Sequence, residues 1–147
     1  MDSLPALHYV FYFAAPPEKV WEGFVSPETN RIIFMGAELD IQPRPGGKMN
    51  YVGPGPDGQP MVYVRCHIQE IEPPRRLRYT FAMGPSPIAS TVTVELTPES
   101  EATKVAVTHN GWDPADAKTH AECTDGWPRI LSRLKTLLET GKTFKPH

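Results

Sequence analysis

Cysteine is scarce in this sequence, and no export signal is recognisable at its start. Cys66 and Cys123 are the two cysteines among 147 residues. The segment Met1–Ser3 carries no positive charge, and the apolar stretch 9–15 is short and is followed by two prolines. A secretory signal needs a basic start and a separate apolar core. We therefore expect a cytoplasmic protein with two free thiols, because disulfides form mainly in exported proteins.

Long apolar runs and clustered basic residues are also lacking. No apolar segment approaches the roughly 20 residues that a membrane-spanning helix needs. The net charge is −2, and the densest basic cluster is the short run Arg75–Arg78. Electrostatic binding of nucleic acid needs many clustered lysines and arginines. The sequence therefore predicts neither a membrane nor a nucleic acid as a partner.

The motifs of common catalytic and cofactor sites are missing as well. The chain contains no Gly-x-Ser-x-Gly elbow, no glycine-rich phosphate loop and no pair of carboxylates at a suggestive spacing. We therefore predict no catalytic residue and no cofactor. The pattern favours a protein that is not an enzyme, although it does not decide the point.

Proline and glycine are plentiful, and they separate apolar segments instead of forming one biased tract. Residues 7–14 are rich in aromatic and β-branched side chains, which predicts a first strand. Pro17 suits the first turn of a helix, where its missing N–H is no loss. Ser26 and Pro27 then restart the helical pattern as a second short helix that ends at Phe34.

From residue 37 onward the apolar period changes from helical spacing to two. Such alternation is typical of strands with one buried face. It predicts short strands over residues 38–42, 48–52, 62–69, 77–81, 91–96 and 104–109. Short connections rich in glycine and proline favour an antiparallel arrangement of these strands.

The last third of the chain predicts one long helix. Asp113 can cap its start, an apolar stripe runs from Trp127 to Leu138, and Gly141 can cap its end. Pro128 lies inside this stretch, so we expect the helix to kink or to split just before it. A sheet with one apolar face needs a cover, and this helix is the available one. The whole pattern predicts a single α+β domain over residues 1–147.

Three groups of segments, spread over nearly the whole chain, carry a family resemblance. They are Ala15–Trp21 with Ser26–Glu28; Pro45–Met49 with Gly55–Gly58 and Ile71–Leu77; and Thr108–Gly111 with Gly126–Trp127. In this order they resemble the START-like SRPBCC superfamily, and specifically its branch similar to the C-terminal domain of the activator of the ninety-kilodalton heat-shock-protein ATPase. The resemblance implies a helix-grip fold: a curved antiparallel β-sheet wrapped around a long C-terminal helix, with two short helices after the first strand.

That resemblance also implies a pocket between the sheet and the long helix. The family usually has a tryptophan late in the second short helix, where this chain has Phe34. We expect the smaller ring to reshape the mouth of the pocket. Members range from ligand carriers and cyclases to co-chaperones, so the fold alone does not give the function.

Six residues are candidates for ligand contacts on the inner face of the predicted fold. Strand parity places several of these residues on the same side of their strands as apolar core residues, and Trp127 begins the apolar stripe of the long helix. The candidates are Tyr51, Tyr79, Phe81, His109, Trp112 and Trp127. Plain core packing is the alternative for each aromatic residue, because such side chains fill protein interiors everywhere.

His109 is the most informative polar candidate. It shares strand parity with Val105 and Val107, so it points inward. It either contacts a ligand or acts as a general base, or it is a structural histidine whose hydrogen bonds are satisfied, which we favour. His120 and Cys123 share a helix face and suggest zinc together with His109. No fourth ligand has a fitting spacing, so we predict no metal site.

The leading hypothesis is that the protein binds a small hydrophobic or aromatic ligand in an internal cavity between the sheet and the C-terminal helix. One alternative is a protein-interaction module that resembles a co-chaperone and takes part in the stress response. The other is an enzyme of the cyclase or hydrolase type that uses the same pocket with His109 as its base. A homodimer is compatible with all three.

Overall fold

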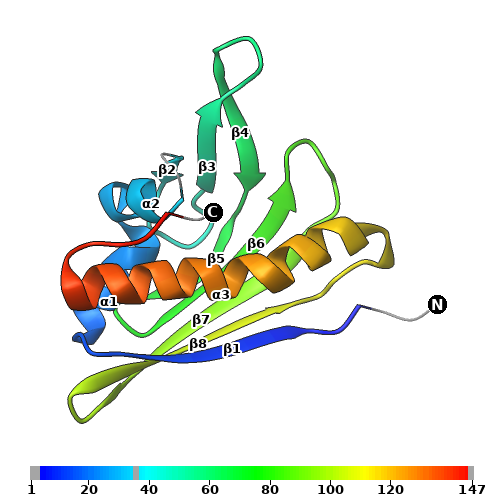
Figure 1. The fold of residues 1–147 in the computed structure, drawn as a ribbon. Helices are drawn as coiled ribbons and strands as arrows, with labels where there is room; N and C mark the ends of the chain where they lie inside the picture. Colours follow the sequence, from blue (N-terminus) through cyan, green and yellow to red (C-terminus); the bar gives the residue numbers. More distant parts are fainter. Residues whose placement is uncertain (1–3, 35–36, 146–147) are drawn as a thin grey trace.

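The structure is a computed structural model that describes residues 4–34 and 37–145, so Met1–Ser3 lies outside the described residues. Its helices and strands follow the predicted order (Figure 1). They are β1 (Leu7–Phe13), α1 (Pro17–Val25), α2 (Pro27–Ile33), β2 (Glu38–Ile41), β3 (Met49–Pro54), β4 (Pro60–Arg65), β5 (Ile68–Glu72), β6 (Arg76–Met83), β7 (Ser90–Glu99), β8 (Ala102–Asn110), the short 3₁₀ helix η1 (Pro114–Asp116) and α3 (Ala117–Thr140).

The strands form one eight-stranded antiparallel sheet. The order is β1-β8-β7-β6-β4-β3-β2, and β5 pairs with β6 beside that path. The sheet curves, and α3 runs across one of its faces, with α1 and α2 at one end of the helix (Figure 1). This arrangement confirms the predicted α+β class and the helix-grip architecture.

The corner between the first two helices is built around Ser26. Its N–H donates to the carbonyl oxygen of Glu22 at 2.7 Å, which ends α1. Its side-chain oxygen accepts from the N–H of Thr29 at 3.4 Å, which caps α2. Pro17 and Pro27 occupy the first turns of the two helices, as predicted. One residue therefore ends α1 and caps α2.

The strand predicted over residues 62–69 is wrong in its continuity, because the structure divides it into β4 and β5. Cys66 and His67 lie in the break, where the N–H of Met49 donates to the carbonyl oxygen of Cys66 at 2.9 Å and His67 forms a bridge with Lys48. Both halves still pair with β6. The apolar alternation continues through the break, since Cys66 and Ile68 are both buried. The sequence pattern therefore does not indicate the break between β4 and β5.

The long helix does not split at Pro128. The missing N–H of Pro128 leaves the carbonyl oxygen of Thr124 without its usual helical donor. The hydroxyl of Tyr9, on β1, donates to that oxygen at 2.9 Å. This contact from the sheet supports an unbroken α3. Its end matches the prediction, because Gly141 adopts a left-handed conformation with φ of 85°.

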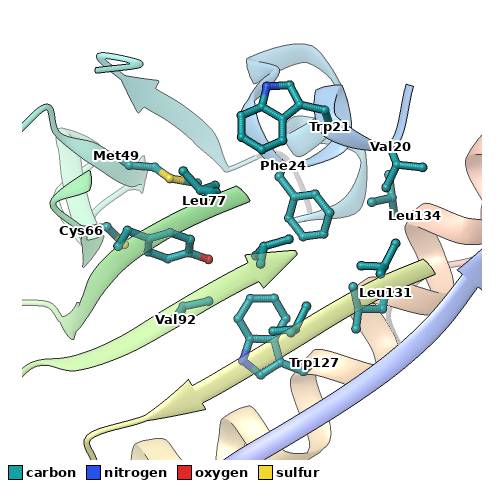
Figure 2. Packing of buried hydrophobic residues seen from close by; sticks show 14 of the residues in the cluster. Val20, Trp21, Phe24, Met49, Cys66, Leu77, Val92, Trp127, Leu131 and Leu134 are labelled. Carbon is teal, nitrogen blue, oxygen red and sulfur yellow. The ribbon is translucent and has the colours of Figure 1, made fainter. Parts of the chain in front are cut away.

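The core lies between α1, α3 and the inner face of the sheet (Figure 2). Val20 and Phe24 of α1 pack near Leu134 of α3, and Leu134 is fully buried. A Cβ atom at Gly23 would lie 2.5 Å from Cδ1 of Leu134. A larger residue at this position would therefore displace the side chain of Leu134.

Cys66 and Cys123 are both free, as expected. Within residues 4–34 and 37–145, no helix combines the length and the apolar character that crossing a membrane requires.

Candidate ligand-binding site

A cavity of about 300 Å³ lies between α3 and the sheet. Six of its lining residues come from the sheet: Tyr51, Tyr63, Val64, Tyr79, Phe81 and Met83. Six more come from α3: Thr119, Glu122, Cys123, Gly126, Trp127 and Ile130. Phe34 and Ala37 complete the wall at the end of α2. The wall is thus largely apolar and rich in aromatic rings, which is the composition of sites that bind small organic molecules.

The cavity has an exposed side and a buried side. Tyr63 on β4 is 41% exposed, and Glu122 on α3 is exposed as well. Tyr51 and Tyr79 are buried, and the ring of Tyr51 lies 4.8 Å from that of Phe34. The opening therefore lies between the β3–β4 hairpin and the first half of α3, and the inner end lies near α2.

Arg65 ties together two segments beside the opening. Its Nε donates to the carbonyl oxygen of Gly84 at 2.6 Å, and its Nη2 donates to the carbonyl oxygen of Ser86. The N–H of Gly84 in turn donates to the carbonyl oxygen of Tyr63 at 2.8 Å. These bonds join the turn after β6 to the β4 strand. They hold Tyr63 and Met83 in place on the cavity wall.

Trp127 is held in the wall by a buried histidine. The indole N–H of Trp127 donates to Nδ1 of His109 at 3.0 Å. An indole N–H can only donate, so Nδ1 must be unprotonated and the proton of the neutral ring is on Nε2. Nε2 lies 2.6 Å from the hydroxyl oxygen of Ser90 and donates to it, and that hydroxyl lies 3.3 Å from the carbonyl oxygen of Phe81. The network fixes one tautomer of His109 and one orientation of Trp127.

His109 is fully buried, and this burial sets its protonation. Desolvation, with a smaller contribution from His120, lowers the pKa of His109 from 6.5 to about 3. The imidazole is therefore neutral at ordinary pH. Both of its nitrogens are engaged in hydrogen bonds, so neither is available as a general base for a molecule in the cavity.

Three titratable side chains of the wall, Cys123, Tyr51 and Tyr79, are also held in their neutral forms. Burial raises the pKa of the Cys123 thiol to about 12. Burial also raises the pKa of the Tyr51 and Tyr79 hydroxyls well above the ordinary value. Cys123 is thus a thiol and not a thiolate nucleophile, and the two phenols keep their protons.

The six predicted ligand contacts separate into two groups. Tyr51, Tyr79, Phe81 and Trp127 lie on the cavity wall. His109 and Trp112 lie outside the lining, on the far side of Trp127. Trp112 stacks on His109 with ring centroids 4.0 Å apart, and its indole N–H donates to the carbonyl oxygen of His109 at 2.9 Å. These two residues support the wall without forming its surface.

Several lining residues were not among the sequence candidates. Cys123 and Ile130 lie four residues before and three residues after Trp127, which places all three on one face of α3. That spacing is visible in the sequence and would have found them. Tyr63 and Met83 carry no such signal, because their place at the opening depends on how β4 and β6 pair.

His120 and Cys123, which share a face of the predicted helix, make separate contacts in the structure. Nε2 of His120 donates to the carbonyl oxygen of Pro5 at 2.8 Å, and its ring packs edge-on against Trp112. Cys123 faces the cavity instead. In the part of the chain that the structure describes, no group of three or more His, Cys, Asp or Glu side chains is arranged to hold a metal ion.

An antiparallel sheet that grips a terminal helix beside an apolar cavity defines the SRPBCC class of proteins. Within that class the chain belongs to the Activator of Hsp90 ATPase homolog 1-like family, whose model matches residues 14–139. No curated protein matches the chain.

Solved structures of similar fold come from several sources. Protein MLL2253 from Mesorhizobium loti is 24% identical with a TM-score of 0.76, and the match covers 92% of this chain and 97% of that one. PFC0360w, an HSP90 activator from Plasmodium falciparum, is 20% identical with a TM-score of 0.76 over 91% and 96% of the two chains. DynU16, a protein of the dynemicin biosynthetic locus, is 25% identical with a TM-score of 0.71 over 94% of this chain and 48% of its own.

Proposed function

We propose that this protein binds a small hydrophobic or aromatic ligand in the cavity between α3 and the sheet. The observation that carries the proposal is the cavity itself, with a volume of about 300 Å³ and a wall of apolar and aromatic side chains. Sites for small organic molecules typically measure about 300–1,000 Å³ and combine an apolar wall with a few polar groups. Tyr51, Tyr79, Phe81 and Trp127 are the proposed contacts, and His109 and Trp112 position Trp127.

An enzymatic role in the same pocket has less support. His109 is the residue expected to act as a base, and its two nitrogens are bonded to Trp127 and Ser90. Cys123 carries the thiol of the wall, and its raised pKa keeps it protonated. The geometry therefore favours binding over acid–base or nucleophilic catalysis.

A titration with a neutral fluorescent probe tests the proposal. N-phenyl-1-naphthylamine is apolar, and its emission rises when it leaves water. The Cys123→Trp variant places a large ring in the cavity, whereas Lys118→Trp places the same ring on an exposed part of α3 outside the lining. We expect saturable binding to the unmodified protein and to Lys118→Trp, and a loss of about tenfold or more in affinity for Cys123→Trp, because the added ring occupies the binding volume. No saturable binding by the unmodified protein, or unchanged affinity in a folded Cys123→Trp variant, would overturn the proposal.

A second candidate function is a co-chaperone-like interaction with another protein. Val10 and Tyr12 on β1 are 40% and 51% exposed, and β1 is at one end of the strand order. Two exposed apolar side chains on an edge strand provide a contact for a partner. Stimulation of the ATPase activity of an Hsp90 chaperone by this chain, lost in Val10→Lys/Tyr12→Lys and kept in Cys123→Trp, would favour this function. No stimulation by the unmodified chain would leave it without support.

A further inference from the structure

A polar group without a partner lies beside the inner end of the cavity. Asn30 on α2 is fully buried, and its Nδ2 donates to the carbonyl oxygens of Gly23 at 3.1 Å and Ser26 at 2.9 Å. Two carbonyl neighbours fix the orientation of the amide, because only its NH₂ group can face them. Its oxygen, Oδ1, therefore faces away from them, and it accepts no hydrogen bond from the described residues. A buried acceptor in this state is unusual and needs an explanation.

The space next to Asn30 shares part of its lining with the cavity. Asn30 lines a void of about 10 Å³, and Tyr51, Tyr79 and Trp127 line both this void and the larger cavity. A void of that size accommodates about one water-sized group. The inner end of the cavity thus adjoins a space for a single polar atom.

Two further side chains with hydrogen-bonding groups line the same void. Tyr51 and Tyr79 are more than nine-tenths buried, and their hydroxyls form no hydrogen bond with the rest of the described chain. Burial raises the pKa of both phenols, so both hydroxyls can donate as well as accept. Together with Oδ1 of Asn30 they provide one acceptor and two donors among apolar rings.

No positively charged side chain of the described residues lines this end of the cavity, and the buried Arg133 nearby donates instead to the carbonyl oxygens of Ile32 and Ile33. Among the described residues, no lysine, arginine or histidine lines it, and the charged side chain of the wall is Glu122 at the opening. Burying a carboxylate or phosphate without a counter-charge is strongly unfavourable. A hydrocarbon without any polar group would leave the three polar groups unpaired, which also weakens binding.

We infer that the cavity selects an uncharged ligand with an apolar body and one hydroxyl or N–H group, and that this group points inward to Oδ1 of Asn30 and the hydroxyls of Tyr51 and Tyr79. The inference rests on the proposed ligand-binding function and specifies the chemical class of the ligand. The apolar body then lies against Trp127 and Ile130, and the ligand enters with its polar end first.

Isothermal titration with three probes of one shape tests the inference. The probes are 2-naphthol, 2-methylnaphthalene and 2-naphthoate, which place a hydroxyl, a methyl and a carboxylate on the same ring system. We expect 2-naphthol to bind about tenfold or more tightly than 2-methylnaphthalene, because it satisfies the polar groups. We expect 2-naphthoate to bind at least about a hundredfold more weakly than 2-naphthol, because its charge would be buried without a partner.

Tyrosine-to-phenylalanine variants, which remove one hydroxyl each, show which residues cause the preference for 2-naphthol. Tyr51→Phe and Tyr79→Phe each remove one hydroxyl at the inner end and should reduce the preference for 2-naphthol over 2-methylnaphthalene. Tyr63→Phe is the matched control, because the hydroxyl of Tyr63 already donates to the carbonyl oxygen of Pro54 at the opening. The preference should be unchanged in this control.

The outcomes separate this inference from the proposed function. If 2-methylnaphthalene binds as tightly as 2-naphthol or more tightly, the inference is overturned while binding in the cavity stands. A preference that survives intact in both Tyr51→Phe and Tyr79→Phe also overturns it. If none of the three probes binds, both the inference and the proposed function fail.

Discussion

The indole N–H of Trp127 donates a 3.0 Å hydrogen bond to Nδ1 of His109. This bond joins α3 to β8, and it joins the wall of the cavity to the buried network behind it. Trp127 is therefore held by a residue that does not itself line the cavity. In the proposed function, the histidine that stands out in the sequence acts through the tryptophan, which would provide the surface for a ligand.

The buried His109 makes stability depend on pH. In the unfolded chain its ring takes up a proton below about pH 6.5, whereas in the folded protein its pKa is about 3. The unfolded state binds more protons between these values, so stability should fall as the pH decreases through this window. His109→Asn keeps an acceptor for Trp127 and removes the titrating ring. Urea unfolding of both proteins over this range should show a smaller decrease in stability for the variant; parallel curves would mean that His109 does not titrate as described.

Leu134 lies at the centre of the contact between α3 and α1, and it is fully buried. Leu134→Ala should lower the free energy of unfolding by about 2–5 kcal/mol, because it removes a large side chain from a packed core. Thr136→Ala, on a less buried part of the same helix, should change it by about 0.5 kcal/mol or less. Equal urea midpoints for the two variants would show that the core-facing side of α3 is assigned wrongly.

Gly23 and Leu134 should be energetically coupled. Gly23→Ala alone should destabilise the protein by about 1–3 kcal/mol, because the new methyl would lie 2.5 Å from Cδ1 of Leu134. Leu134→Ala removes the atoms that it meets. The double variant should therefore be more stable than the sum of the two single effects predicts, by about 0.5–3 kcal/mol. Strict additivity in the double-mutant cycle would contradict the close approach of α1 to α3.

Arg65 should control local opening beside the cavity. The loop of residues 55–59 is at the exposed tip of the β3–β4 hairpin and should exchange its amide hydrogens faster than the central strands. Residues 84–87 also lie at the opening, but Arg65 bonds to Gly84 and Ser86 there. Arg65→Met should raise the exchange rates of the Gly84 and Ser86 amides by about tenfold or more, because a charged donor is lost. Unchanged rates in the variant, measured by NMR, would mean that these bonds do not hold the turn.

Much of the fold follows from the sequence because its apolar periods are regular. Alternation predicts most strands, and parity correctly places Leu77 and Tyr79 on the buried face of β6. The break at Cys66 leaves that alternation intact, so it depends on hydrogen bonds from the neighbouring β3 strand. At Pro128, the hydrogen bond that satisfies the freed carbonyl oxygen of α3 comes from Tyr9, more than a hundred residues away. Such long-range bonds have no local pattern.

The site was less predictable than the fold. Strand parity predicts that Tyr51 and His109 both point inward. Tyr51 lines the cavity, whereas Trp127 and Trp112 cover the ring of His109 and separate it from the cavity. Asn30 resembles an ordinary surface residue of a short helix in the sequence. Its burial becomes visible only when α2 is packed against the end of α3.

The proposed function places an apolar ligand in the cavity between α3 and the sheet. Intermolecular NOEs between bound N-phenyl-1-naphthylamine and assigned methyl groups report whether a ligand lies there. We predict NOEs to the methyl groups of Ile130 and Val64, which line the cavity, and none to those of Val10 and Ile32, which are exposed elsewhere. NOEs confined to Val10 and Ile32 would show binding at the outer surface and would contradict the account.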